Sequence, residues 1–293
     1  MSVINLRDVP VRDVTEGDIV FSRQMFGAAA GTARIGASRY VVAPLARQMP
    51  VHVHGDEEEI FFVLDGSGLS WERDGACAVG PGDTIVHPPR RAPHTFLAGP
   101  DGLELLAFAS GSETSITYLP RAGVMWCGPR WVPVDAPHPF KAEGAAGALE
   151  RPEAGPRPRN VVALGDVDTG TLSAAEVRAL GVAAGSSQAG LNHVSLGPGS
   201  RGAPPHCHAL EEEVFLVLEG SGTLRLGEAE HRLSAGDVVA RPPGTGVPHA
   251  IAAGPDGLTY LAYGTRVPGD SVYYPESGQV RLRGLGVTID VAR

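Results

Sequence analysis

The chain repeats one long sequence pattern at a nearly constant spacing. HVHGDEEEIFFVLDG at residues 52–66 is matched by HCHALEEEVFLVLEG at residues 206–220, which lies 206 − 52 = 154 positions later. The match extends upstream, where FGAAAGTARIG (26–36) corresponds to LGVAAGSSQAG (180–190), and downstream, where GPDGLELLAF (99–108) corresponds to GPDGLTYLAY (254–263). Self-similarity at a fixed spacing is the signature of a duplicated structural unit. We therefore expect two similar domains in tandem.

The length of 293 residues agrees with this division, because it suggests about two domains. Between the repeats lies KAEGAAGALERPEAGPRPRN (141–160), which is rich in Ala, Gly and Pro and poor in large apolar residues. Such a composition is typical of a linker or an extended connection. We predict an N-terminal domain at residues 1–145, a linker at 146–159 and a C-terminal domain at 160–293.

The hydrophobic pattern predicts an all-β chain. Short runs rich in Val, Ile, Leu and Phe are separated by turn sequences such as DG, GSG, PGD and GPDG. In EIFFVLDG and EVFLVLEG both alternating sets of side chains are mostly apolar, so these strands should be covered on both faces. A barrel or sandwich that packs on another sheet would give this pattern. The packing could occur within the chain or in a homodimer, and we expect a homodimer.

Composition and charge exclude several classes of function. The net charge is −9 and no Lys/Arg cluster occurs, which argues against a nucleic-acid surface, and no segment is spare for a helix-turn-helix. No stretch reaches the roughly 18 apolar residues of a membrane span, and the first residues lack the basic start and apolar run of a signal peptide. We therefore expect a cytoplasmic protein without membrane or nucleic-acid partners. Three cysteines, Cys77, Cys127 and Cys207, give no disulfide framework.

Two histidines separated by one residue recur in both repeats. Residues i and i+2 of a strand point to the same face, so His52 and His54 share a face, as do their counterparts His206 and His208. In each copy a glutamate follows the second histidine by five residues, and a short turn can bring it beside the pair. Buried imidazoles and a buried carboxylate satisfy one another around a cation, whereas each alone is costly to bury.

A later histidine, preceded by Pro and followed by an apolar strand start, completes the set in each half. Three imidazoles and one carboxylate suit divalent transition metals such as Fe, Mn, Ni or Zn, and leave coordination positions open for water or substrate. The predicted ligands are His52, His54, Glu59 and His94 in the first half and His206, His208, Glu213 and His249 in the second.

The sequence does not identify a catalytic residue, and the candidates are Glu59, Glu213, His87 and Arg241. His87 and its counterpart Arg241 could line the mouth of each barrel and bind an anionic substrate, or could lie at an exposed strand end. Arg90 and Arg91 add positive charge to the first copy, which favours the N-terminal site for an anionic substrate. The other glutamates of the two acidic runs, Glu57, Glu58, Glu211 and Glu212, are expected in a solvated turn.

These residues resemble the motifs of the cupin superfamily. The first cupin motif is HxH, four residues, Glu, six residues and Gly, and both halves match it, from His52 to Gly66 and from His206 to Gly220. The second motif, G-D, a strand, P-x-G and a late His, is similar to PGDTIVHPPRRAPH (81–94) and AGDVVARPPGTGVPH (235–249). Here the late His follows its Gly by twelve and thirteen positions rather than the usual eleven, and the extra residues fall in the turns.

The resemblance implies a bicupin, with two tandem double-stranded β-helix (jelly-roll) barrels and one metal ion per barrel, held by the ligands named above. The second half is also similar to a group of poorly characterised bacterial cupins with a GTGVxH turn and a YYPxSG tail. The implied function is that of a metal-dependent enzyme of the dioxygenase, decarboxylase or isomerase type, acting on a small polar or carboxylate compound. The alternative is a metal-containing binding or storage bicupin without turnover.

Overall fold

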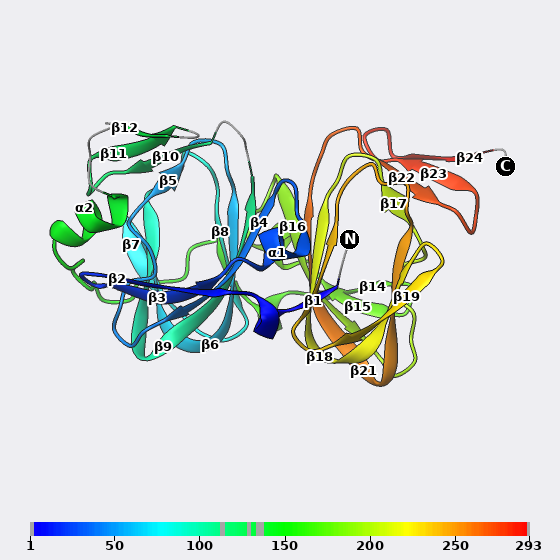
Figure 1. The fold of residues 1–293 in the computed structure, drawn as a ribbon, viewed down its shortest axis with the longest axis horizontal. Coiled ribbons are helices and arrows are strands. Elements are labelled where there is room, and N and C mark those ends of the chain that lie inside the picture. The colour runs from blue at the N-terminus through cyan, green and yellow to red at the C-terminus, as the bar shows by residue number, and fades with distance from the viewer. Residues whose placement is uncertain (1–2, 112–114, 128–129, 133–137, 292–293) are drawn as a thin grey trace.

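The protein consists of two β-barrels that lie side by side, as Figure 1 shows. The computed structural model describes residues 3–111, 115–127, 130–132 and 138–291. Antiparallel strands dominate both barrels, which confirms the predicted all-β class with two tandem jelly-roll barrels. The helical elements are short: α1 (Phe26–Ala30), α2 (Pro139–Ala145), α3 (Leu180–Ala183), and the 3₁₀ turns η1 (Leu6–Asp8) and η2 (Leu164–Asp166).

The N-terminal barrel contains a large sheet with the strand order β13-β8-β6-β9-β4-β3-β2, in which β7 also pairs with β6. Its strands are β2 (Val11–Glu16), β3 (Ile19–Gln24), β4 (Ile35–Val42), β6 (Glu59–Glu72), β7 (Gly75–Val79), β8 (Asp83–His87), β9 (His94–Ser110) and β13 (Val161–Ala163). A small sheet, β12-β11-β10-β5, closes one end. Its strands are β5 (Val53–His54), β10 (Ile116–Leu119), β11 (Val124–Cys127) and β12 (Arg130–Val132).

The C-terminal barrel repeats this arrangement, with a large sheet in the order β1-β20-β18-β21-β16-β15-β14, in which β19 pairs with β18. Its strands are β1 (Ile4–Asn5), β14 (Thr169–Leu172), β15 (Ala175–Arg178), β16 (Ala189–Leu196), β18 (Glu213–Leu226), β19 (Ala229–Ser234), β20 (Asp237–Arg241) and β21 (His249–Thr265). The small sheet β17-β22-β23-β24 is formed by β17 (Cys207–His208), β22 (Ser271–Tyr274), β23 (Gln279–Leu282) and β24 (Val287–Asp290).

The motif glycines mark bulges in the longest strands. Strands β6 and β9 shift register between Gly66 and Gly68, and β18 and β21 shift between Gly220 and Gly222. Gly66 and Gly220 have φ of +78° and +81°, a conformation that residues with a Cβ rarely adopt. A Cβ at Gly66 would also clash with the carbonyl oxygen of Gly102. The bulge therefore requires the glycine that the repeat preserves.

The two barrels exchange their first strands. β1, at the start of the chain, pairs with β20 of the C-terminal barrel, with Ile4 opposite Val238. β13, which follows the linker, pairs with β8 of the N-terminal barrel, with Val161 opposite Ile85. In Figure 1, β1 accordingly lies at the C-terminal barrel, whereas β2 and β3 belong to the N-terminal barrel. Each repeat thus contributes one strand to the sheet of its neighbour.

The two barrels also pack directly against each other and share one hydrophobic core. Phe108 and Tyr263, which are equivalent residues of β9 and β21, stack across this interface with ring centroids 5.1 Å apart. Other buried members come from the strands that follow the two acidic runs, among them Ile60 and Val214. Packing within the chain therefore buries both faces of β6 and β18, which explains why both faces are apolar.

Glu58 and Glu212 contradict the expectation of a solvated turn, because both are fully buried. The carboxylate of Glu58 accepts hydrogen bonds from the Ser186 hydroxyl and from the backbone N–H groups of residues 187 and 188 in the second repeat. Glu212 accepts bonds from the backbone N–H groups of residues 33, 34 and 35 in the first repeat. Glu57 and Glu211 are also shielded, with side-chain exposures of 17% and 8%. The acidic runs therefore join the barrels and approach the histidines.

Residues 146–159 run along the outside of the N-terminal barrel. The N–H of Gly155 donates to the carbonyl of Ala76 at 2.7 Å, and the guanidinium of Arg157 forms two bonds of 2.8 and 2.7 Å with the carboxylate of Asp83. This segment leads the chain from α2 to the exchanged strand β13. Within the described residues no helix is long and apolar enough to cross a membrane.

Candidate metal centres

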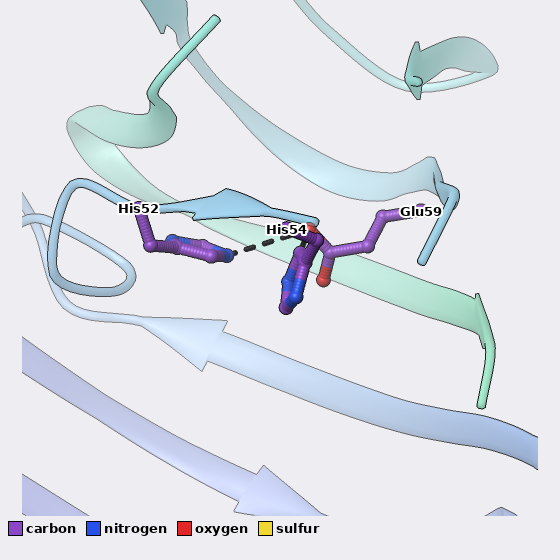
Figure 2. Close-up of side chains that lie close together, drawn as sticks. All are labelled: His52, His54 and Glu59. Atoms are coloured by element: carbon purple, nitrogen blue, oxygen red, sulfur yellow. Dashed lines mark ion pairs between the residues drawn. The ribbon is translucent and has the colours of Figure 1, made fainter. Parts of the chain in front are cut away.

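In the N-terminal barrel, the predicted ligands meet at one carboxylate oxygen. Oε2 of Glu59 lies 3.4 Å from Nε2 of His52, 3.3 Å from Nε2 of His54 and 2.9 Å from Nε2 of His94. His54 ends the short strand β5, Glu59 begins β6 and His94 begins β9. Figure 2 shows His52, His54 and Glu59 converging from neighbouring segments. Backbone hydrogen bonds between His52 and His94, of 3.2 and 2.9 Å, fix the two segments to each other.

Hydrogen bonds on the far side of the rings fix their tautomers. Nδ1 of His52 lies 2.7 Å from the Pro50 carbonyl, and Nδ1 of His94 lies 3.1 Å from the Ala92 carbonyl. A carbonyl oxygen can only accept, so each Nδ1 carries the proton and each Nε2 presents its lone pair to the centre. This is how histidine ligands are oriented in metal sites.

The C-terminal barrel repeats the constellation with a looser spacing. Oε2 of Glu213 lies 3.1 Å from Nε2 of His249 and 3.7 Å from Nε2 of His208. A ligand atom of His206 lies within 4.8 Å of those of Glu213 and His249. Nδ1 of His206 is held by the Pro204 carbonyl at 2.7 Å, as Nδ1 of His52 is by the Pro50 carbonyl.

The atoms at both centres fit a shared cation. Donor atoms bound about 2.1 Å from one ion at right angles lie about 3 Å apart, close to the shorter separations seen here. Three atoms that face the centres, Nε2 of His54, Nε2 of His249 and Oε2 of Glu213, are buried without a hydrogen-bond partner in the described part of the chain. Such groups are costly to bury unless something else satisfies them. A divalent cation in each centre would satisfy them.

The pKa directions describe the charge that the centres favour. Burial alone would raise the pKa of Glu213, but the adjacent imidazole of His249, 3.1 Å away, and the charges of the other nearby imidazoles lower it to about 2. The pKa of Glu59 lies well below its usual value, because the effects of His54 and of its other histidine partners outweigh burial. Burial and repulsion from His249 lower the pKa of His206 to about 4. Both carboxylates are therefore anionic at neutral pH, and His206 is neutral.

His87 does not lie at an exposed strand end. Its side chain is buried, and its ring stacks on that of His94 with centroids 3.8 Å apart and planes inclined by 4°. Nδ1 of His87 lies 3.3 Å from Oε1 of Glu72. The counterpart Arg241 is likewise buried, and it bonds the carbonyl of Val247. Both residues support the late-histidine strand instead of facing solvent.

Arg90 and Arg91 are exposed in the turn before His94. Nε of Arg90 donates to the Gly55 carbonyl at 2.6 Å, so this cation is held against the segment that follows His54. A different arginine, Arg23, points into the N-terminal barrel, where its guanidinium donates to the Ser38 hydroxyl at 3.0 Å. No sequence pattern singled out Arg23, because it lies in β3, far along the chain from both motifs.

Two anchoring residues were also missed. Thr117 Oγ1 lies 3.0 Å from Nδ1 of His54, and Asp270 Oδ2 lies 2.7 Å from Nδ1 of His208. Both lie in or beside strands of the small sheets, far along the chain from the histidines that they orient. The pairing of β5 with β10 and of β17 with β22 brings them together. No short-range spacing signals these contacts.

Comparison with known proteins agrees with the architecture. A family model described as "Cupin domain" matches residues 38–108 and again residues 192–261. The solved structure of oxalate decarboxylase from Bacillus subtilis at pH 4.6 is 17% identical, with a TM-score of 0.60, and the match covers 89% of this chain and 75% of that chain. A formate complex of Lactobacillus farciminis oxalate decarboxylase is 16% identical, with a TM-score of 0.63 and coverage of 93% and 88%.

At such identities, the likeness to the decarboxylases concerns the fold. A comparison with curated proteins found no match. The two family matches fall one in each repeat, and each covers the HxH motif, its glutamate and the late histidine of that repeat. The chain therefore belongs to the cupin superfamily, as a bicupin with one cupin domain in each half.

Proposed function

We propose that this bicupin is a metal-dependent enzyme that binds one divalent transition-metal ion in each barrel and acts on a small polar or carboxylate compound. The observation that carries the proposal is the convergence of imidazole nitrogens on one carboxylate oxygen in both barrels. The proposed ligands are His52, His54, Glu59 and His94, and His206, His208, Glu213 and His249. Fe, Mn, Ni and Zn all suit this donor set.

A bound metal ion would supply Lewis-acid chemistry, by polarising an oxygen of the substrate at an open coordination position. The residues of the chain have separate tasks. The histidines present nitrogen donors, and contacts of the Nδ1 atoms fix the orientation of His52, His54, His94, His206 and His208. Glu59 and Glu213 contribute negative charge, and each is a candidate for holding a proton during turnover, whereas the buried His87 and Arg241 position the strands that carry the ligands.

The reaction type within this class is a further proposal. The structural neighbours are named as oxalate decarboxylases, so decarboxylation of a short carboxylate is the first reaction to test, followed by oxygen-dependent and isomerising reactions. The second candidate function is a metal-containing binding bicupin without turnover. The buried ligand geometry is equally suitable for a binding protein. A turnover assay distinguishes the enzyme from the binding protein, whereas metal content does not.

Metal analysis tests the proposal directly. Protein reconstituted with Mn, Fe, Ni or Zn should carry up to two ions per chain, measured by elemental mass spectrometry. The double variants His52→Ala/His54→Ala and His206→Ala/His208→Ala should each lower the content by about one ion. Glu230→Gln, which changes an exposed acid on β19, serves as the control. Metal content near zero after reconstitution would refute the proposal, and full content without turnover of any short carboxylate would favour the binding protein.

We also propose that the protein is a cytoplasmic homodimer. Exposed apolar side chains on the edge strand β24, Val287 and Ile289, support self-association. Light scattering should give the dimer mass, and the monomer mass at working concentration would contradict this.

A further inference from the structure

A cavity of about 130 Å³ lies inside the C-terminal barrel, beside its candidate metal centre. His206, Glu213 and His249 form one part of its wall. Most of the remaining wall is apolar and comes from the inward faces of β15, β16, β18 and β21, through Ala175, Val177, Val194, Phe215, Ile251 and Ala262. Among the described residues that line this cavity, none is Lys or Arg.

The register of the strands identifies the equivalent positions in the N-terminal barrel. Phe21 pairs with Val42 in β3 and β4, as Ala175 pairs with Leu196 in β15 and β16. At four cavity positions the N-terminal barrel carries the larger side chain. The pairs are Phe21 and Ala175, Arg23 and Val177, Tyr40 and Val194, and Phe96 and Ile251.

These larger side chains occupy the corresponding space of the N-terminal barrel. The rings of Phe21 and Tyr40 pack edge to face at 5.4 Å, and Phe21 also contacts Phe140 of α2 at 6.2 Å. The guanidinium of Arg23 lies 5.2 Å from the centroid of the Tyr40 ring. The two halves therefore surround similar ligand sets with different interiors: one with larger side chains and a cation in the N-terminal barrel, and a hollow, mainly apolar one in the C-terminal barrel.

We propose that the C-terminal barrel binds a small monoanion with an apolar body, such as a branched short-chain carboxylate. Its anionic oxygen faces the metal centre, and its apolar body fills the cavity between Ala175, Val194 and Ile251. These three residues set the size of the ligand, since larger side chains fill the same positions in the first repeat. This inference rests on the proposed metal centre and names the ligand class of its C-terminal copy.

Size and charge select this class. An apolar cavity of about 150 Å³ accommodates benzene, so the cavity here takes an apolar body of about four to six carbon atoms. The carboxylate of the ligand is compensated by the metal ion. A second carboxylate would lie against Val194 and Ile251 without a cationic partner, and burying an unpaired charge is strongly unfavourable. A monoanion with a branched chain therefore fits better than a compact dianion.

The test uses isovalerate as the probe and acetate as its truncated counterpart. With the full-length protein loaded with zinc, calorimetric titration should give an isovalerate affinity at least about tenfold higher than that of acetate, because the additional carbons leave water. Ala175→Phe introduces the residue found at the equivalent position of the first repeat and should weaken isovalerate binding about tenfold or more, with little effect on acetate. The zinc content of every sample is measured in parallel.

Ala174→Phe is the matched control, because Ala174 is exposed in the turn beside Ala175, and this variant should bind isovalerate like the unaltered protein. If Ala175→Phe does not fold, Val194→Tyr provides the same test with the side chain of Tyr40. Equal affinities for isovalerate and acetate, or unchanged binding in the filled variants, would overturn the inference while the metal centre stands. Zinc that fails to bind at all would refute the metal centre itself, and this inference with it.

Discussion

His208 is anchored by the carboxylate of Asp270, which lies 2.7 Å from its Nδ1. Asp270 is fully buried, and its other oxygen accepts the backbone N–H groups of Leu210 and Glu211. Nδ1 of the equivalent ligand of the first repeat, His54, lies nearest to the neutral hydroxyl of Thr117, at 3.0 Å, with the carboxylate of Glu57 farther away at 3.4 Å. A carboxylate partner makes an imidazole a stronger metal donor than a hydroxyl does. The two centres therefore differ in the group that lies closest to the Nδ1 atom of one ligand histidine.

This difference predicts that Asp270→Asn weakens metal binding at the C-terminal centre by about 10- to 100-fold. The measurement is competition with a chromophoric chelator, in protein whose N-terminal centre has been removed by His52→Ala/His54→Ala. Thr117→Val, tested in protein that lacks the C-terminal centre, should have a smaller effect, because only a neutral partner is lost. Equal losses in the two variants, or an unchanged affinity in Asp270→Asn, would show that the carboxylate does not strengthen the ligand.

The reciprocal contacts of Glu58 and Glu212 predict a large contribution to the stability of the two-barrel unit. Glu58→Gln places an amide group opposite the hydroxyl and N–H donors that the carboxylate satisfies. Because hydrogen bonds to a buried charged group are strong, we expect the free energy of unfolding to fall by about 2 kcal/mol or more. We expect a similar loss of unfolding free energy for Glu212→Gln.

Urea unfolding followed by circular dichroism measures both changes. Glu228→Gln is the control, since the Glu228 side chain is 99% exposed, and such a surface change should stay within about 0.5 kcal/mol. If Glu58→Gln and Glu212→Gln unfold at the same urea concentration as the control, the acidic runs do not hold the barrels together.

The two barrels, and the histidines and glutamates that meet in each of them, could be predicted from the sequence because the duplication aligns each of these motif residues with a second copy of itself. His94 and His249 stand at shifted spacings in the second motif, yet both reach their centres, because the surplus residues lie in the turns before them. These features depend on local pattern and strand alternation, which a sequence displays directly.

Other features depend on how the two repeats meet in space. The run of acids before Ile60 has the composition of a solvated loop. Glu58 is buried and accepts hydrogen bonds because the C-terminal barrel packs against it. The burial of His87 likewise requires its stacking on His94, from a different strand. The difference between the barrel interiors was present in the sequence at Phe21 and Ala175, but it becomes visible only once the strand register makes these residues equivalent.

A buried ion pair connects α2 to the N-terminal barrel and leads to another prediction. Arg47 has no exposed surface, and its guanidinium is paired with Glu143 of α2 and, at 2.6 Å, with Asp18. Removing one partner of a buried pair leaves a poorly compensated charge, which costs about 3 kcal/mol or more. We expect Glu143→Ala to lower the free energy of unfolding by about this amount.

Glu104→Ala provides the comparison, since Glu104 pairs with Arg39 at a partly exposed site where such a pair contributes about 1 kcal/mol or less. Denaturant unfolding should therefore separate the two variants clearly. Similar losses in both would mean that α2 is not fixed to the barrel through Arg47.

The low pKa values of two ligand histidines predict how the metal-free protein responds to acid. Burial and repulsion from neighbouring imidazoles lower the pKa of His94 to about 3 and that of His206 to about 4, from an ordinary value of 6.5. Below pH 6.5 these two histidines bind protons in the unfolded chain, whereas in the folded chain they stay neutral until the pH is much lower. The stability that depends on these two groups is therefore fully present above this pH and is lost as the pH drops from 6.5 towards 4.

Thermal unfolding of the chelator-treated protein between about pH 7 and about pH 4.5 measures this loss. His206→Gln removes one of the two groups, so its melting temperature should fall less steeply over the same range. His231→Gln is the control, because His231 lies on β19 away from both centres and should leave the slope unchanged. The prediction fails if the melting temperature is constant or rises on acidification, or if His206→Gln and the unaltered protein share one slope.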